Sequence, residues 1–349
     1  MGKVVVFTRP RTVEFESFED PPLAPHEVRV RTLYSGISAG TELTAYRGSN
    51  PYISKQWDAK NRLFLTSEVP SQPYPLSGWG YEEVGEVIEV HPDVTTLKVG
   101  DIVYGTWGHR THHILQEDYA NKRIKPQGLD PILAIYSHIG PIALNGILDA
   151  NIHVGETVAV FGLGVLGQVI AQLAKLNGAR VFGVDMIEKR LGLAKELRAI
   201  ECGFNPKEGS PAEQVKALTD GRGADVTIEV TGSAKALHEA VRATAYSARV
   251  VALGFFQGEA QGLLLGEEFH HNRIQLVCSQ IGNVDPVLSY RWDRIRLIHT
   301  IMDLQTKGSL NLRPVITHVI PFKQAAQGFQ ILDETPEQAL QVVLEFSEE

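Results

Sequence analysis

The stretch Thr157-Val-Ala-Val-Phe-Gly-Leu-Gly-Val-Leu-Gly167 decides the fold. It opens with a short apolar run typical of a buried strand, and apolar residues at helical spacing continue from Val165 to Asn177. Between strand and helix the glycines follow the pattern G-x-G-x-x-G, which is weak alone but informative in this context. The start of the helix would present free N–H groups to a pyrophosphate. The sequence therefore predicts a dinucleotide-binding loop made of Gly162, Leu163, Gly164, Val165, Leu166 and Gly167.

Strands and helices alternate on the carboxyl side of this loop. Ala179–Asp185 has the composition of a second buried strand, and the charged segment Glu188–Leu197 is predicted to be a helix. Two further strands are expected at Ala224–Val230 and Arg249–Leu253, with a helix between them, and Ile274–Ser279 is the expected last strand. This order predicts an α/β fold with a doubly wound parallel sheet.

Several polar or small residues stand where strands of such a sheet end. Asp185 follows the glycine pattern by 18 residues, and its carboxylate can accept hydrogen bonds from both hydroxyls of an adenosine ribose. It would also repel a 2′-phosphate, so we expect NAD rather than NADP, although Lys189 and Arg190 lie close by. We expect Arg190, Thr231 and Gly254 to contact the cofactor as well.

The amino-terminal and carboxyl-terminal parts of the chain lack this regular alternation of strands and helices. Short strands are expected at Val4–Phe7, Glu27–Leu33, Val84–Val90 and Asp101–Tyr104, and residues 46–75 are predicted to be a surface loop with one helical turn. After the parallel sheet we expect helices at Pro131–Leu148, Pro286–Lys307 and Phe322–Leu332, and strands at Val315–Ile320 and Gln341–Phe346. The amino-terminal part is therefore predicted to be a separate β-rich domain.

Composition excludes several classes of protein. The chain has 349 residues and 33 Lys+Arg against 41 Asp+Glu, which argues against a nucleic-acid binder. Its two cysteines, Cys202 and Cys278, cannot form a disulfide framework or a Cys-rich zinc lobe, and we expect both to be buried. No secretory signal is visible, and the longest apolar stretch is too short to cross a bilayer. We expect a cytoplasmic protein with a small-molecule substrate and no membrane or nucleic-acid partner.

At this point the chain resembles the medium-chain dehydrogenase/reductases, the alcohol dehydrogenase superfamily. Residues Gly85 to Gly105 resemble a glycine- and valine-containing signature of that family. The segment His318-Val-Ile-Pro-Phe322 resembles the family's segment in which the chain returns to the catalytic domain. The resemblance implies a GroES-like catalytic domain at residues 1–137, a Rossmann NAD-binding domain at 138–280, and a return to the catalytic domain at 281–349. We expect a homodimer or homotetramer.

The resemblance breaks at the residues that bind zinc in other members. Where they have G-I-C-G-T-D, this chain has Gly36-Ile-Ser-Ala-Gly-Thr-Glu42, with Ser38 in place of the cysteine and one residue inserted. Where they have G-H-E, it has Gly80-Tyr-Glu82, and the third ligand position falls on His138 or Ser137. Neutral hydroxyls are poor zinc ligands, so we predict neither catalytic nor structural zinc. These two motifs resemble a zinc-lacking branch that includes the bacteriochlorophyllide hydroxyethyl dehydrogenase.

Without zinc, another group must handle the proton of an alcohol. Tyr81, Ser38 and His138 stand where the ligands would be, and Glu82 is adjacent, so these four are our catalytic candidates. Two histidine clusters, His109 with His112 and His113, and His270 with His271, are reserve candidates.

We therefore predict an NAD-dependent oxidoreductase that interconverts an alcohol and a carbonyl. The alternatives are an NADPH-dependent quinone or enoyl reductase without zinc, and an inactive NAD(H)-binding redox sensor.

Overall fold

The computed structural model describes residues 1–66 and 69–347, and its contacts divide the chain into two compact units. Unit 1 comprises Met1–His138 and Ile316–Glu349, and unit 2 comprises Ile139–Val315.

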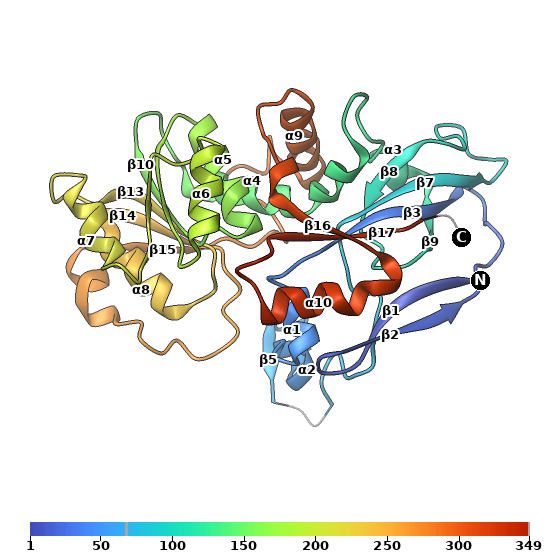
Figure 1. The fold of residues 1–349 in the computed structure, drawn as a ribbon, viewed down its shortest axis with the longest axis horizontal. Coiled ribbons are helices and arrows are strands. Elements are labelled where there is room, and N and C mark those ends of the chain that lie inside the picture. Colours follow the sequence, from blue (N-terminus) through green and yellow to red (C-terminus); the bar gives the residue numbers. More distant parts are fainter. Residues whose placement is uncertain (67–68, 348–349) are drawn as a thin grey trace. The chain divides into compact units, whose positions relative to one another are not determined.

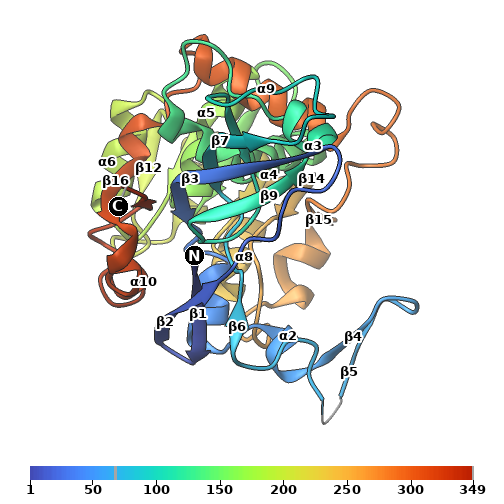
Figure 2. The same cartoon turned by 90° about the vertical axis from the view of Figure 1, so that its right-hand side faces the viewer.

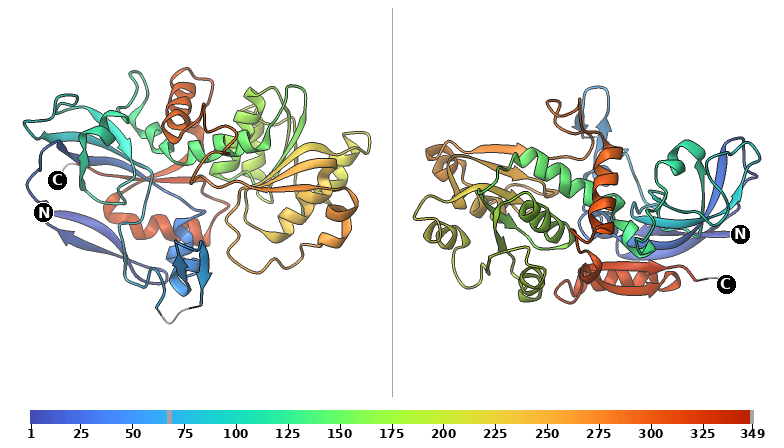
Figure 3. Two further views of the ribbon diagram at one scale, coloured as in Figure 1. Left: turned by 180° about the vertical axis from the view of Figure 1, so that it is seen from behind. Right: turned by 90° about the horizontal axis from the view of Figure 1, so that it is seen from above.

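Unit 2 is built on a parallel sheet of six strands in the order β12-β11-β10-β13-β14-β15 (Figure 1). The strands are β10 (Thr157–Phe161), β11 (Arg180–Val184), β12 (Cys202–Phe204), β13 (Ala224–Glu229), β14 (Thr244–Ala252) and β15 (Gln275–Cys278). The strand order reverses beside β10, so the doubly wound sheet predicted from the sequence is confirmed. Figure 3 shows the same strands from behind.

Helices join and cover these strands. They are α4 (Ile139–Ala150), α5 (Val165–Leu176), α6 (Glu188–Glu196), α7 (Pro211–Ala217), α8 (Ala234–Ala243) and α9 (Arg294–Thr306), with short turns η2 (Leu265–Phe269) and η3 (Arg313–Val315). Apolar residues of α7 and α8 pack with Phe161 and Phe182 against one face of the sheet. The fold thus leaves the carboxyl ends of β10, β11, β13 and β14 side by side, where the predicted cofactor residues lie.

Unit 1 is mainly antiparallel. Its larger sheet has the order β16-β17-β3-β7-β8, with β9 paired to β3, and its smaller sheet has the order β2-β1-β6. These strands are β1 (Gly2–Arg9), β2 (Thr12–Phe18), β3 (Glu27–Ile37), β6 (Leu76–Ser77), β7 (Glu83–Val90), β8 (Ile102–Gly105), β9 (His112–Gln116), β16 (Ile316–Pro321) and β17 (Gln341–Glu345). Figure 2 shows β1, β2 and β6 together, and a separate hairpin of β4 (Gln56–Asp58) and β5 (Leu63–Leu65).

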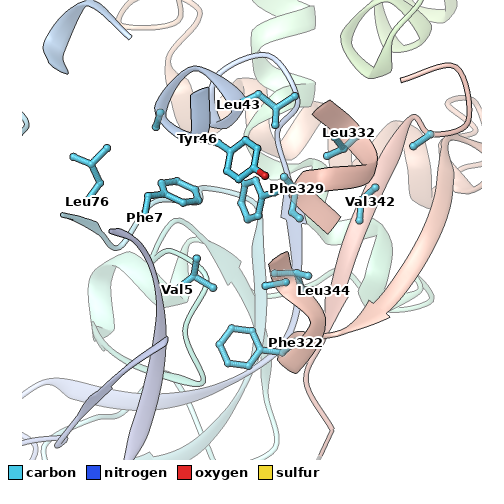
Figure 4. Close-up of a cluster of buried hydrophobic side chains, with 14 residues drawn as sticks. Val5, Phe7, Leu43, Tyr46, Leu76, Phe322, Phe329, Leu332, Val342 and Leu344 are labelled. Carbon is cyan, nitrogen blue, oxygen red and sulfur yellow. The ribbon is translucent and has the colours of Figure 1, made fainter. Parts of the chain in front are cut away.

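The short helices of unit 1 are α1 (Glu42–Arg47), α2 (Pro51–Ser54), α3 (Glu117–Asn121), η1 (Pro131–Ser137), η4 (Phe322–Gln324) and α10 (Ala325–Glu334). An aromatic core joins β1, α1 and α10 (Figure 4). The ring of Phe329 lies 5.0 Å from Phe7 and 5.5 Å from Tyr46, measured between centroids. His109 lies edge-on to Phe329 at 5.8 Å, so this core also forms one wall of the site described below.

Two details of the sequence prediction differ from the structure. The helix expected over Pro131–Leu148 is broken at His138, where η1 ends and α4 begins. Residues 281–315, expected in the returning catalytic segment, lie in unit 2, because the buried face of α9 packs on α4. The tight contact is at Gly140, where a Cβ atom would lie 2.5 Å from a methyl carbon of Ile301.

Two other points concern exposure and membranes. Cys202 is half-buried and Cys278 is exposed, so the expectation of two buried cysteines was wrong. Among the described residues no single helix is long and apolar enough to cross a membrane, and only the bent pair Pro131–Ser137 and Ile139–Ala150 passes that test of length and composition together.

Candidate functional site

The glycine loop of unit 2 uses its three glycines for different reasons. Gly162 has φ = +97°, a conformation that favours glycine. At Gly167 a Cβ atom would lie 1.9 Å from the carbonyl oxygen of Gly162, so the first turn of α5 packs directly on the loop. A Cβ atom at Gly164, in contrast, would meet only the Arg190 side chain, at 3.9 Å. Packing within the protein therefore does not require glycine at position 164, and the backbone there is open to a ligand.

Asp185 lies directly after β11 and beside this loop. Its carboxylate accepts hydrogen bonds from the backbone N–H groups of Leu163, at 2.7 Å, and Ile187, at 2.8 Å. The guanidinium of Arg190 lies 3.8 Å from the same carboxylate. An anion, Asp185, and a cation, Arg190, thus lie together at one end of the loop. Asp185 is the residue predicted to bind the ribose, and Arg190 is the one that could attract a 2′-phosphate.

The ends of β13 and β14 complete this edge of the sheet. Buried Glu229 accepts hydrogen bonds from the backbone N–H groups of Thr231 and Gly232, and the Thr231 hydroxyl also donates to it. Burial raises the pKa of Glu229 above its ordinary value, although these hydrogen bonds oppose the shift. A Cβ atom at Gly254 would lie 2.2 Å from the backbone nitrogen of Gly232. Thr231 and Gly254 therefore lie on the same side of unit 2 as the glycine loop, and Thr231 packs on Gly162.

Unit 1 brings three of the four catalytic candidates together. The Tyr81 hydroxyl donates a hydrogen bond to Oγ of Ser38. The ring of His138 lies against the ring of Tyr81, with centroids 4.3 Å apart and planes at 37°. Burial, followed by the negative charges of Glu82 and Glu42, raises the pKa of Tyr81. The phenol is therefore protonated at neutral pH and is a proton donor rather than a base.

Glu82, the fourth candidate, has a different position. Its side chain is buried under Gly36, where a Cβ atom would lie 2.3 Å from its Oε2. Within the described part of the chain, that Oε2 has no hydrogen-bond partner. Burial, together with the charges of Glu42 and Glu83, raises the pKa of Glu82 well above its ordinary value. Glu82 is thus a buried carboxyl group behind Tyr81, suited to hold a proton rather than to contact a substrate.

The structure also reveals a buried hydrogen-bonded chain that the sequence did not single out. Nε2 of His109 lies 2.5 Å from a Glu42 carboxylate oxygen, and its Nδ1 lies 2.6 Å from Oγ of Ser35. Ser35 donates a hydrogen bond to Glu83, which also accepts the backbone N–H of Trp107. All four linked side chains are fully buried. The neighbouring carboxylate of Glu42, and then that of Glu83, raises the pKa of His109 against the opposing effect of burial, and burial raises the pKa of Glu83 to about 7.

The reserve histidines are not equivalent. His112 and His113 lie on β9 and are half-buried, whereas His270 and His271 are exposed in unit 2. Only His109 of these five is fully buried between acidic groups. The sequence signal that points to its surroundings is the pair Glu82-Glu83 at the start of a predicted strand, because adjacent carboxyls that become buried must be paired with a cation or neutralised by a proton.

Comparisons with known proteins give the family. The profile of zinc-binding dehydrogenases matches residues 165–297. The D-guloside 3-dehydrogenase of Shigella flexneri is 33% identical over 353 aligned residues, which cover 99% of this chain and 100% of that protein. The chain therefore belongs to the zinc-binding dehydrogenase family of the medium-chain dehydrogenase/reductases, as its motifs predicted. It is an oxidoreductase, as its curated relatives are dehydrogenases.

Solved structures share the fold over the whole chain. A short chain alcohol dehydrogenase of Escherichia coli CFT073, in complex with NADH, has a TM-score of 0.77 and 20% identity, with 99% of each chain covered. A protein of Sinorhizobium meliloti 1021 bound to NADP has a TM-score of 0.78 and 19% identity, also with 99% of each chain covered. The predicted combination of a Rossmann domain and a GroES-like domain is thereby confirmed.

The donors at the former ligand positions do not fit the zinc that the family name implies. Ser38 and Tyr81 offer neutral hydroxyls that hydrogen-bond to each other, and the raised pKa of Tyr81 disfavours a phenolate ligand. Both cysteines lie on strands of unit 2. Among the described residues, only His238, Glu267 and Glu268 form a group of three acidic or imidazole ligands within 4.8 Å of one another, and they lie in unit 2 at the surface.

We expect purified protein to contain well below one zinc per chain, because the only good nitrogen donor among these positions is His138. Metal analysis of the wild type and of His238→Ala measures this directly, since the variant removes any zinc held at the surface group. Near-stoichiometric zinc that persists in His238→Ala, and that chelators remove together with activity, would contradict the expectation.

Proposed function

We propose that the chain is an NAD-dependent dehydrogenase that interconverts an alcohol and a carbonyl without catalytic zinc. The observation that carries the proposal is the glycine loop with its open backbone at Gly164 and the Asp185 carboxylate beside it. When bound, the nicotinamide accepts or returns the hydride of the substrate carbon. Two proteins of the same fold are bound to NADH and NADP, which supports a nicotinamide cofactor.

The proton would be handled in unit 1. Tyr81 stays protonated near neutrality, so its hydroxyl would donate to the oxygen of a carbonyl substrate during reduction. In the structure this one proton is directed at Ser38, so with a carbonyl bound it would turn to the substrate oxygen, and the Ser38 hydroxyl would then donate to the phenol oxygen and keep it oriented. In the oxidation direction a free phenolate is unfavourable, so the proton would be relayed: Tyr81 takes the substrate proton as it passes its own to Ser38, and Ser38 releases its hydroxyl proton to water.

The substrate class comes from the relative. Because the D-guloside 3-dehydrogenase is related over the whole chain, we propose a secondary hydroxyl of a sugar or glycoside as the substrate. We further propose that the protein acts in the cytoplasm as a homodimer or homotetramer. A panel of glycosides, polyols and simple alcohols assayed with NAD and NADP tests these points, and absence of turnover on all alcohols would contradict the proposed reaction.

An NADP-dependent variant of the same chemistry is the second candidate. Arg190 favours it, because its guanidinium lies near both Asp185 and Gly164. The Asp185 carboxylate favours NAD, and it is fixed by two backbone N–H groups.

We expect Asp185→Ser to lower the preference for NAD over NADP by about 10- to 100-fold, the range for loss of a charge-assisted hydrogen bond. The variant removes the acceptor for the ribose and the negative charge that would repel a 2′-phosphate. The ratio of kcat/KM for the two cofactors measures the change.

Asp225→Ser is the matched control for this variant. Asp225 also accepts a backbone N–H, that of Thr157 at 2.9 Å, but it lies at the amino ends of the strands. We expect its cofactor ratio to stay at the wild-type value. Equal ratios in wild type and Asp185→Ser would show that Asp185 does not bind the ribose.

A further inference from the structure

The contacts of the buried chain of unit 1 require one proton beyond those of a neutral histidine, a serine hydroxyl and two carboxylates. The Ser35 hydroxyl donates to Glu83, so its oxygen must accept from Nδ1 of His109, while Nε2 faces the acceptor oxygen of Glu42. His109 is then an imidazolium between two carboxylates. If the proton moves to Glu83 instead, Ser35 reverses its hydrogen bond and every contact remains satisfied. Loss of that proton would leave one contact of 2.6 or 3.0 Å without a hydrogen.

Glu42 links this chain to the candidate catalytic pair. Oε1 of Glu42 accepts the backbone N–H of Ser38 at 2.9 Å, and the Glu42 backbone N–H donates to the carbonyl oxygen of Ser38, also at 2.9 Å. These two bonds close the loop between β3 and α1, which contains the inserted residue. The side chain of Thr41, at the start of α1, makes no capping bond, so the Glu42 carboxylate supplies that closure.

The same loop carries the hydroxyl that Tyr81 uses. The Tyr81 hydroxyl donates to Oγ of Ser38. A shift of the Ser38 backbone would therefore move this Oγ and change the orientation of the Tyr81 hydroxyl. Misplacement of a reacting group by about 1 Å costs on the order of 10²-fold in rate.

We propose that Glu42 and His109 are positioning residues of this dehydrogenase: paired in the interior of unit 1, they hold the backbone of Ser38 and thereby orient the Ser38–Tyr81 hydroxyl pair toward the substrate oxygen. This role rests on the proposed function, because it requires that the Ser38–Tyr81 pair handles the proton. His109 neutralises the Glu42 carboxylate. By holding Oε2 of Glu42, it leaves Oε1 to accept the backbone N–H of Ser38.

Two substitutions of His109 test its contact with Glu42 separately from its contact with Ser35. The amide nitrogen of glutamine lies about where Nε2 of histidine lies, and that of asparagine about where Nδ1 lies. His109→Gln therefore retains a donor for Glu42 and loses the Ser35 contact, whereas His109→Asn retains the Ser35 contact and leaves Glu42 unpaired. We expect kcat to fall about 10- to 100-fold in His109→Asn and less than about 5-fold in His109→Gln.

A substrate deuterium isotope effect distinguishes positioning from a loss of stability. Poor orientation slows the chemical step, so the isotope effect on kcat should rise in His109→Asn and stay at the wild-type value in His109→Gln. A purely structural role would lower the thermal midpoint and the fraction of active enzyme in both variants without changing the isotope effect. If His109→Asn does not fold, Glu42→Gln and Glu42→Met give the same contrast, because glutamine retains an acceptor for the Ser38 N–H.

His26→Asn is the matched control, because His26 also pairs with a glutamate of unit 1, Glu117, at 3.1 Å, but is exposed. His26 has φ = +61°, which asparagine tolerates, and we expect wild-type kinetics. Wild-type kcat and isotope effect in His109→Asn would overturn the positioning role while leaving the proposed function intact. A wild-type chain inactive on every alcohol would overturn both.

Discussion

Tyr81→Phe is expected to lower kcat by about 10²- to 10⁴-fold, the range for loss of a general acid–base group. The substitution keeps the ring and its contact with His138 and removes only the hydroxyl that donates to Ser38. Because burial and the nearby carboxylates raise the pKa of Tyr81, the phenol stays protonated through neutral pH. We therefore expect the rate of carbonyl reduction to show no ionisation of Tyr81 between about pH 6 and 9.

Steady-state kinetics in both directions, with NAD affinity measured separately, check this expectation. Tyr74→Phe is the matched control, because Tyr74 is another half-buried phenol of unit 1 with a raised pKa, and its hydroxyl donates to the carbonyl oxygen of Ala45. It should retain wild-type kcat. Ser38→Ala should show a smaller loss than Tyr81→Phe. If both Tyr81→Phe and Ser38→Ala turn over at the wild-type rate, the proton is not handled at this pair.

The fold could be predicted from the sequence because its signals are local. The strand before Gly162, the glycine spacing and the helix that begins at Val165 are contiguous, and the structure has all three in the predicted places. The expectations that differed have different causes. The break at His138 does have a local signal, Gly140-Pro141, because proline is tolerated in the first turn of a helix but not in its interior, and the prediction of one continuous helix overlooked it. The placement of α9, in contrast, depends on the contact of Ile301 with Gly140, which are far apart in sequence.

The candidate site could be predicted only at positions that belong to a recognisable family motif. Ser38 and Tyr81 were found because they replace known ligands in two motifs, and the structure joins them by a hydrogen bond. His109 was only one of five reserve histidines, and its pairing with Glu42 was missed, because Glu42 is 67 residues away and belongs to another element. A histidine in a polar segment has the same sequence signature whether it is exposed or buried between carboxylates. Only the packing of β3, β7 and α1 places His109 between Glu42 and Ser35 in the interior.

Gly167→Ala is expected to weaken NAD binding by about 100-fold. The added Cβ atom would lie 1.9 Å from the carbonyl oxygen of Gly162, so the first turn of α5 must move away from the loop. That shift misdirects the N–H groups at the start of α5, which the proposed site uses to bind the pyrophosphate. Forcing a methyl group into close packing also destabilises a protein by about 1–3 kcal/mol. Calorimetric titration with NAD and thermal unfolding measure the two effects.

Gly192→Ala makes the same chemical change within the same unit and should act in the opposite direction. Gly192 lies in the middle of α6, and a Cβ atom there would meet nothing within 4 Å. Alanine in a helix interior is more stable than glycine by about 0.5–1 kcal/mol, so this variant should unfold at a higher temperature and bind NAD normally. If Gly167→Ala bound NAD as tightly as Gly192→Ala does, a displacement of α5 would not affect cofactor binding. In that case α5 would not be the element that holds the pyrophosphate.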